Sequence, residues 1–203
     1  IPDSVFAKHE SKHFNHVTTK AELAAVLTKM KALQASFEVT QALRFALLVF
    51  MRPANVCNLK WTQIDFDQGV ITIEANEMKK EREFLVPLSK QATVILSEIK
   101  PLTGHTEFVF NSPYSTGKPI SRDSLSNALR RNGITEISPH GLRHTASTLL
   151  HEEGCSSDAI ELQLSHVIGG IRGVYNKAQY FDQRKVMMQD WADYVDKLSR
   201  NKF

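Results

Sequence analysis

The residues best placed to do chemistry lie on a predicted helix that begins near Pro139. At about 100° per residue, His140, Arg143 and His144 fall on one face of this helix. His140 and Arg143 belong to its first turn or so, where free backbone N–H groups and the helix dipole favour a bound anion. An arginine there can hold a phosphate with two hydrogen bonds. Taken alone, the segment slightly favours a solvated face with a few capping contacts, and a phosphate site is the alternative.

The same histidines are also compatible with a zinc site. His140 and His144 stand four residues apart, as zinc ligands on a helix often do, and His166 could supply a third ligand. A metalloprotease motif needs glutamate at position 141, where this chain has Gly141. Arg143 between the two ligands would repel the metal ion. We therefore expect neither a metal nor a cofactor.

Five segments, in order along the chain, resemble the motifs of tyrosine recombinases, the phage integrase family. Any one of these segments alone is weak evidence for the family. Five of them, in the family's order across residues 40–195, identify the chain as a member of it. The residues of these segments are most similar to those of integrases of prophages and genomic islands. The segments are Phe50-Met51-Arg52-Pro53 with Leu59-Lys60-Trp61, Glu77-Met78-Lys79 with Leu85-Val86-Pro87-Leu88-Ser89, Pro139-His140-Gly141-Leu142-Arg143-His144-Thr145, Leu164-Ser165-His166, and Gly173-Val174-Tyr175-Asn176.

The resemblance implies a DNA integrase that cuts and rejoins strands without metal or ATP, to integrate or excise a mobile element. A tyrosine hydroxyl attacks a DNA phosphate, displaces a 5′-hydroxyl and holds the DNA as a 3′-phosphotyrosine. The 5′-hydroxyl of a partner strand then attacks in reverse. The catalytic residues that the resemblance implies are Arg52, Lys79, His140, Arg143, His166 and Tyr175.

The resemblance also implies a role for each of these residues. Arg52 and Arg143 clamp the non-bridging phosphate oxygens, and His166 donates a hydrogen bond to the phosphate. Lys79 protonates the departing 5′-oxygen, and His140 assists deprotonation of the nucleophile.

Three features keep alternatives open. Lys80 or Arg82 could take the place of Lys79, and Tyr180 competes as nucleophile. Asn55 departs from the family, which usually carries an acidic residue three positions after the first arginine. A DNA-binding domain with weak or lost catalysis therefore stays a second hypothesis, and a type IB topoisomerase-like relaxer is another.

The elements that must position these residues predict an α+β fold, mainly α-helical, with a small three-stranded antiparallel sheet at one edge. The resemblance identifies it as the tyrosine-recombinase catalytic fold. Thr19-Lys20-Ala21-Glu22 is typical of a capping box, Gly69 indicates a turn, and Pro87 should end a strand. Ser138 should cap the helix that carries His140 and Arg143. We expect helices over about 19–34, 36–50, a short stretch to 59, 89–100, 121–133, 139–154, 157–164 and 180–198, and strands over 61–65, 70–73 and 84–86.

Composition sets the remaining expectations. With 42% hydrophobic and 23% charged residues, the chain is typical of a globular domain. The longest apolar run, residues 45–51, is too short to cross a bilayer. A net charge of +3 permits nucleic-acid binding without arguing for it, and Cys57 and Cys155 are expected to be reduced thiols. Reduced thiols favour a cytosolic protein, and the resemblance implies the bacterial cytosol.

We predict a linker or tail over 1–17 and one catalytic domain over 18–203. The family's N-terminal DNA-binding domains are expected to be absent from this chain. The implied partners are double-stranded DNA attachment sites and, in the full-length protein, further copies that form a synaptic tetramer.

Overall fold

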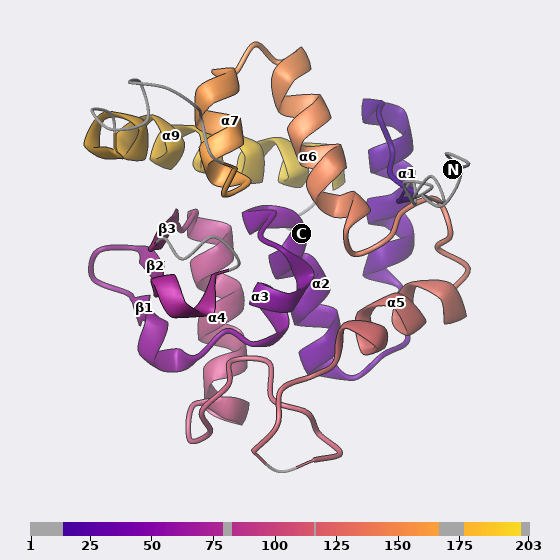
Figure 1. Ribbon diagram of the computed structural model, residues 1–203. Coiled ribbons are helices and arrows are strands. Elements are labelled where there is room, and N and C mark those ends of the chain that lie inside the picture. Colours follow the sequence, from indigo (N-terminus) through magenta and orange to yellow (C-terminus); the bar gives the residue numbers. More distant parts are fainter. Residues whose placement is uncertain (1–13, 79–82, 116, 167–176, 200–203) are drawn as a thin grey trace, which may run out of the picture.

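The computed structural model describes residues 14–78, 83–115, 117–166 and 177–199. Helices form most of this part, and a small antiparallel sheet lies at one edge (Figure 1). This confirms the α+β, mainly helical fold class that the sequence predicts. The helices are α1 (Lys20–Lys31), α2 (Phe37–Val49), α3 (Pro53–Cys57), α4 (Lys90–Thr103), α5 (Arg122–Arg131), α6 (Gly141–Glu152), α7 (Ser157–Gln163) and α9 (Lys177–Ser199).

Helix α2 lies at the centre of the fold. It packs against α3, α4, α5, α6 and α9. A helix that is surrounded in this way must be apolar on every side, and the second half of α2 is. Its side chains Leu43, Phe45, Leu47 and Leu48 are all fully buried. The end of α2 therefore has a fixed position, from which the chain continues into α3.

The sheet has the order β1-β2-β3, with β1 (Ile64–Asp65), β2 (Val70–Ile73) and β3 (Phe84–Pro87) all antiparallel. Ile71 is opposite both Ile64 and Val86. Helix α9 packs against β3. Because β2 and β3 are paired, the sheet fixes where the segment that contains Lys79 leaves and returns.

Several element boundaries differ from the predicted ones. Residues Trp61–Gln63 form a 3-10 helix rather than strand. The Gln63 N–H donates to the Lys60 carbonyl at 3.1 Å, and the Gln63 side-chain oxygen accepts the Lys60 N–H at 2.9 Å. Helix α4 continues through Pro101 to Thr103. A proline in the last turn removes a single hydrogen bond, and the N–H of Gly104 still donates to the carbonyl of Lys100.

A second proline, Pro87, was predicted to end its strand but is part of it. It lies on β3, an edge strand of the described sheet, and is opposite Val70. An edge strand tolerates proline because one side of it needs no N–H donor for the ladder.

Helix α6 has the predicted cap, Ser138, but begins at Gly141 and not at Pro139 as predicted. Ser138 Oγ accepts the N–H of Gly141 at 2.9 Å, as the predicted cap requires. Pro139 and His140 nevertheless form a turn, and the regular helix begins at Gly141. His140 is thereby the residue at the N-terminal boundary of α6.

Residues 14–18 lie against α6 before the chain enters α1, and Val17 is buried there. Residues 1–13 of the predicted linker lie outside the described residues. Within the described part of the chain, no helix has the length and apolarity that a membrane span requires.

Candidate active site

Arg52 lies between the central helix and the short helix α3. Helix α2 ends at Phe50, and Arg52 is the residue before Pro53, which occupies the first position of α3. The Nη1 of Arg52 donates to the hydroxyl of Ser165, which follows α7. The first and fourth of the five motif segments are therefore in direct contact, although 113 residues separate these two side chains.

Arg143 is buried where α6 meets the ends of α2 and α7; only 5% of the residue is exposed. Its Nη1 donates to the Phe50 carbonyl at 2.6 Å, and its Nη2 to the Leu164 carbonyl at 3.0 Å. Carbonyls at helix C-termini lack intrahelical partners, and the helix dipole favours a cation there. Burial, followed by repulsion from Arg52, lowers the pKa of Arg143 to about 10, so the side chain stays charged at neutral pH.

The two helix ends that Arg143 joins share a rare backbone conformation. Phe50 has a φ of 34° and Ser165 a φ of 54°, and these are the two non-glycine residues with positive φ in the described chain. Each such residue costs about 1–2 kcal/mol, which neighbouring contacts must offset. Both residues accept a hydrogen bond from a site arginine, Phe50 through its carbonyl and Ser165 through its hydroxyl.

His140 lies beside Arg143 at the start of α6. Its imidazole contacts that of His144, with ring centroids 5.2 Å apart, and the ring of Phe14, with centroids 4.3 Å apart. Burial lowers the pKa of His140 to about 4, and the charges of Arg143, His144 and Arg52 contribute. His140 is thus neutral near pH 7 and has a nitrogen lone pair that can accept a proton.

His166 is exposed just after α7. Its Nδ1 lies 2.7 Å from Oε2 of Glu161. Since a carboxylate only accepts hydrogen bonds, Nδ1 carries a proton, and Nε2 is the ring nitrogen left for another partner. The backbone N–H of His166 also donates to the Glu161 carbonyl, so this one residue fixes both the backbone and the side chain of His166.

A cavity of about 680 Å³ opens beside Arg52 and His140, between α3, α5 and the start of α6. Among the described residues that line it, the cationic side chains are Arg52 and Arg122 and the acidic one is Asp123. This charge balance suits an anion. The described residues that line it are Phe14, Arg52, Pro53, Ala54, Arg122, Asp123, Ser126, Ser138, Pro139 and His140.

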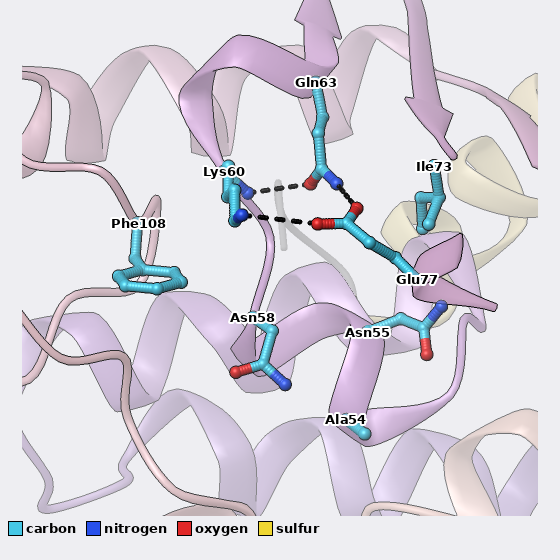
Figure 2. A pocket seen from close by; sticks show the side chains of 8 residues that line it. All are labelled: Ala54, Asn55, Asn58, Lys60, Gln63, Ile73, Glu77 and Phe108. Atoms are coloured by element: carbon cyan, nitrogen blue, oxygen red, sulfur yellow. Dashed lines mark hydrogen bonds and ion pairs between the residues drawn. The ribbon is translucent and has the colours of Figure 1, made fainter. Parts of the chain in front are cut away.

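A second cavity, of about 350 Å³, lies beside the sheet (Figure 2). Glu77 is held there by an ion pair with the Nζ of Lys60, 3.3 Å away, and by a hydrogen bond from Gln63. These bonds fix the chain two residues before Lys79.

Asn55 lines the same cavity, and its Nδ2 donates to the sulfur of Met78 at 3.1 Å. A carboxylate at this position has no N–H to donate. The asparagine that departs from the family pattern therefore has a bonding partner, and that partner directly precedes Lys79.

The structure brings together four of the six residues that the sequence predicts for the site: Arg52, His140, Arg143 and His166. Lys79 and Tyr175 lie outside the described residues. The competing Tyr180 is described, and its hydroxyl donates to Asp158 at 2.7 Å. Across the described residues, no group of three or more His, Cys, Asp or Glu side chains could hold a metal ion.

Three contacts of the site were not predicted. Ser165 lies inside the fourth motif segment, but the motif does not indicate its left-handed conformation or the bond of its hydroxyl to Arg52. Glu161 precedes His166 by five residues, and the end of α7 between them brings the two side chains together. Phe14 carries no signal at all in the sequence, because its contact with His140 depends on how distant segments pack.

The phage integrase family model matches residues 16–180 of the chain. Prophage integrase IntZ of Escherichia coli (strain K12) is 41% identical over 172 residues, which are 83% of this chain and 42% of that protein. The chain thus spans less than half the length of this relative.

Two solved structures have the same fold. The integrase from mycobacterium phage Brujita matches with a TM-score of 0.66 at 15% identity, covering 98% of this chain and 66% of that one. A lambda integrase tetramer bound to a Holliday junction matches with a TM-score of 0.59 at 18% identity, covering 83% and 51%.

Arg143→Ala should lower the free energy of unfolding by about 3 kcal/mol, because two buried helix-end carbonyls lose a charged donor. Arg52→Ala should cost less than about 1 kcal/mol, because its side chain is only partly buried. Urea denaturation of both variants measures the difference. Equal losses would contradict the helix-joining role of Arg143.

Proposed function

The chain belongs to the phage integrase family, and we propose that it is the catalytic domain of a DNA integrase. It cuts and rejoins DNA through a 3′-phosphotyrosine to integrate or excise a mobile element. The observation that carries this proposal is the meeting of Arg52 and Arg143 at the ends of α2 and α7, with His140 and His166 beside them. The domain covers 18–203, and 1–17 leads into it.

In this proposal, Arg52 and Arg143 bind the non-bridging oxygens of the scissile phosphate. A guanidinium has five N–H groups, and the two carbonyl bonds of Arg143 use two of them. Arg143 can therefore keep its place between the helices and still donate to a phosphate. Preorganised donors of this kind contribute about 3–4 kcal/mol each to a transition state.

The remaining roles balance the protons of the reaction. The Tyr175 oxygen forms a bond to phosphorus while the bond from phosphorus to the 5′-oxygen breaks. His140 accepts the tyrosine proton. Because its pKa is low, the ring is neutral near pH 7 and has a free nitrogen lone pair for that proton. Lys79 gives a proton to the leaving 5′-oxygen. His166, whose Nδ1 proton is bound by Glu161, donates from Nε2 to the phosphate in the form of the ring that carries a proton on both nitrogens. Rejoining reverses these transfers.

The partners proposed are double-stranded attachment sites and, in the longer protein, three further copies in a synaptic tetramer. The similar lambda integrase forms a tetramer on a Holliday junction, which supports both partners. The bacterial cytoplasm, where the host chromosome lies, is the proposed compartment.

A DNA-binding domain that no longer cuts is the alternative function. Asn55 was its only support in the sequence, and the bond from Asn55 to Met78 gives that residue a structural use. A topoisomerase-like relaxer would share the cleavage step, but would rejoin each strand to its original end. Strand exchange between two labelled duplexes by the longer protein distinguishes an integrase, which joins ends of different duplexes, from such a relaxer.

Tyr175→Phe should abolish the covalent adduct that the chain forms with a nicked suicide DNA substrate, because the attacking oxygen is missing. Tyr180→Phe is the matched control and should still form the adduct. Denaturing gel electrophoresis detects the product, with a chelator present throughout. An adduct with Tyr175→Phe would contradict the nucleophile, and no adduct with the unmodified chain would favour the DNA-binding alternative.

Lys79→Ala should slow cleavage about 10²–10⁴-fold on ordinary DNA, because the 5′-oxygen leaves without a proton. A substrate with sulfur at the 5′ bridging position should restore most of the rate, since a thiolate is a good leaving group unprotonated. Single-turnover cleavage rates measure both.

Lys80→Ala is the control for this experiment and should behave like the unmodified chain on both substrates. Rescue by sulfur in Lys80→Ala, but not in Lys79→Ala, would move the acid by one position. An equal loss on both substrates in Lys79→Ala would contradict a general acid at position 79.

A further inference from the structure

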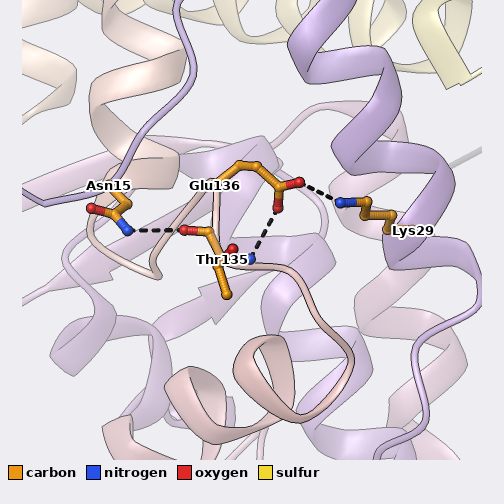
Figure 3. Close-up of polar contacts among 4 residues, drawn as sticks. All are labelled: Asn15, Lys29, Thr135 and Glu136. Carbon is orange, nitrogen blue, oxygen red and sulfur yellow. Dashed lines mark hydrogen bonds and ion pairs between the residues drawn. The ribbon is translucent and has the colours of Figure 1, made fainter.

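The segment of residues 14–17 is bonded to the loop before α6. The Asn15 carbonyl accepts the Ser138 N–H at 2.8 Å and the Ser138 hydroxyl at 3.2 Å. Asn15 Nδ2 donates to the Thr135 carbonyl at 2.9 Å, and Glu136 beside it forms an ion pair with Lys29 of α1 (Figure 3). The loop that leads to His140 is thus held between the 14–17 segment and α1.

The first residue of α6 is suited to this contact. A Cβ at Gly141 would overlap the backbone carbonyl of Asn15, so any larger residue would push the 14–17 segment away. Further along α6, the Val17 N–H donates to the Thr145 hydroxyl at 3.1 Å. Both Val17 and Thr145 are buried, so this end of the segment is fixed as well.

Two rings of the segment contact two histidines of α6. Phe14 contacts His140, and His16 contacts His144 with ring centroids 5.5 Å apart. An extended chain advances about 6.6 Å over two residues, and a helix about 6 Å over four. The spacing of the two pairs therefore matches. Phe14 remains 44% exposed and lines the cavity beside Arg52. Its ring is therefore part of the surface of the site and not of the hydrophobic core.

We propose that Phe14 is a positioning residue for His140, and that the 14–17 segment is thereby part of the active site. The Phe14 ring lies against the imidazole of His140, which also contacts His144, and restricts its rotation. The proposal rests on the proposed function in one respect only, the role of His140 as proton acceptor.

The same contact keeps water from the His140 ring. Burial is the first cause of its lowered pKa, and the charged and titratable groups that contribute are Arg143 and His144 on α6 and Arg52 before α3. The pKa of His144 is also lowered, first by burial and then by the charges of His16, Arg143 and His166. Removing the Phe14 ring leaves these groups in place and admits water, so the pKa of His140 should rise.

Phe14→Ala in the full chain should slow single-turnover cleavage about tenfold to a hundredfold, because a misplaced catalytic group loses this much rate. The rate should also begin to fall below about pH 6.5, where hydrated histidine gains a proton, whereas the unmodified chain keeps its rate to lower pH. Phe14→Tyr should restore the rate and the pH profile. Phe37→Ala is the matched control, since Phe37 is also 44% exposed but lies at the start of α2.

A titration of the His140 ring by NMR, without DNA, tests the contact independently of cleavage. The pKa of His140 should rise from about 4 towards 6.5 in Phe14→Ala and stay low in Phe14→Tyr and Phe37→Ala. An unchanged titration and an unchanged pH profile in Phe14→Ala would overturn the proposal. If the unmodified chain forms no adduct, the proposed function fails while the titration still decides the role of Phe14.

Discussion

The guanidinium of Arg143 bridges two helix C-termini, and the arrangement of Arg52 and His166 depends on this bridge. Its bonds to the carbonyls of Phe50 and Leu164 join the end of α2 to the end of α7. Arg52 follows the first of these ends and His166 the second. At both ends the backbone turns through a left-handed residue, Phe50 after α2 and Ser165 after α7. The side chains of Arg52 and His166 therefore leave the two helix ends in fixed directions. One buried cation thus sets the geometry in which a phosphate can be bound.

A second buried contact extends this arrangement to the sheet. Gln163 donates to the Val49 carbonyl at 2.8 Å and accepts from Arg184 of α9 at 2.6 Å. Arg184 also donates to the Leu85 carbonyl of β3, and burial lowers its pKa to about 10. The strand that follows the Lys79 segment is therefore linked to the same helix ends as Arg52. This interior network holds strand β3 against the helix ends that precede Arg52 and His166.

The sequence predicted the helices, the antiparallel pairing and the His-x-x-Arg helix, because these follow from local periodicity and capping. It placed Arg143 on a polar face, whereas the structure buries it. Helical periodicity tells which residues share a face, but not that two carbonyls of other helices will lie against that face. Phe14 could not be predicted either, since its partner His140 is far away in sequence. The helix was predicted to end before Pro101, but α4 continues to Thr103 because a proline near a helix end is tolerated.

The most direct measurement is a crystal structure of the chain covalently joined to a nicked DNA substrate. The 3′-phosphate should be on Tyr175, with its non-bridging oxygens about 3 Å from the guanidinium groups of Arg52 and Arg143. Arg143 should at the same time keep its bonds to the Phe50 and Leu164 carbonyls. A phosphate held elsewhere, or an Arg143 that must leave both carbonyls to reach it, would contradict the account.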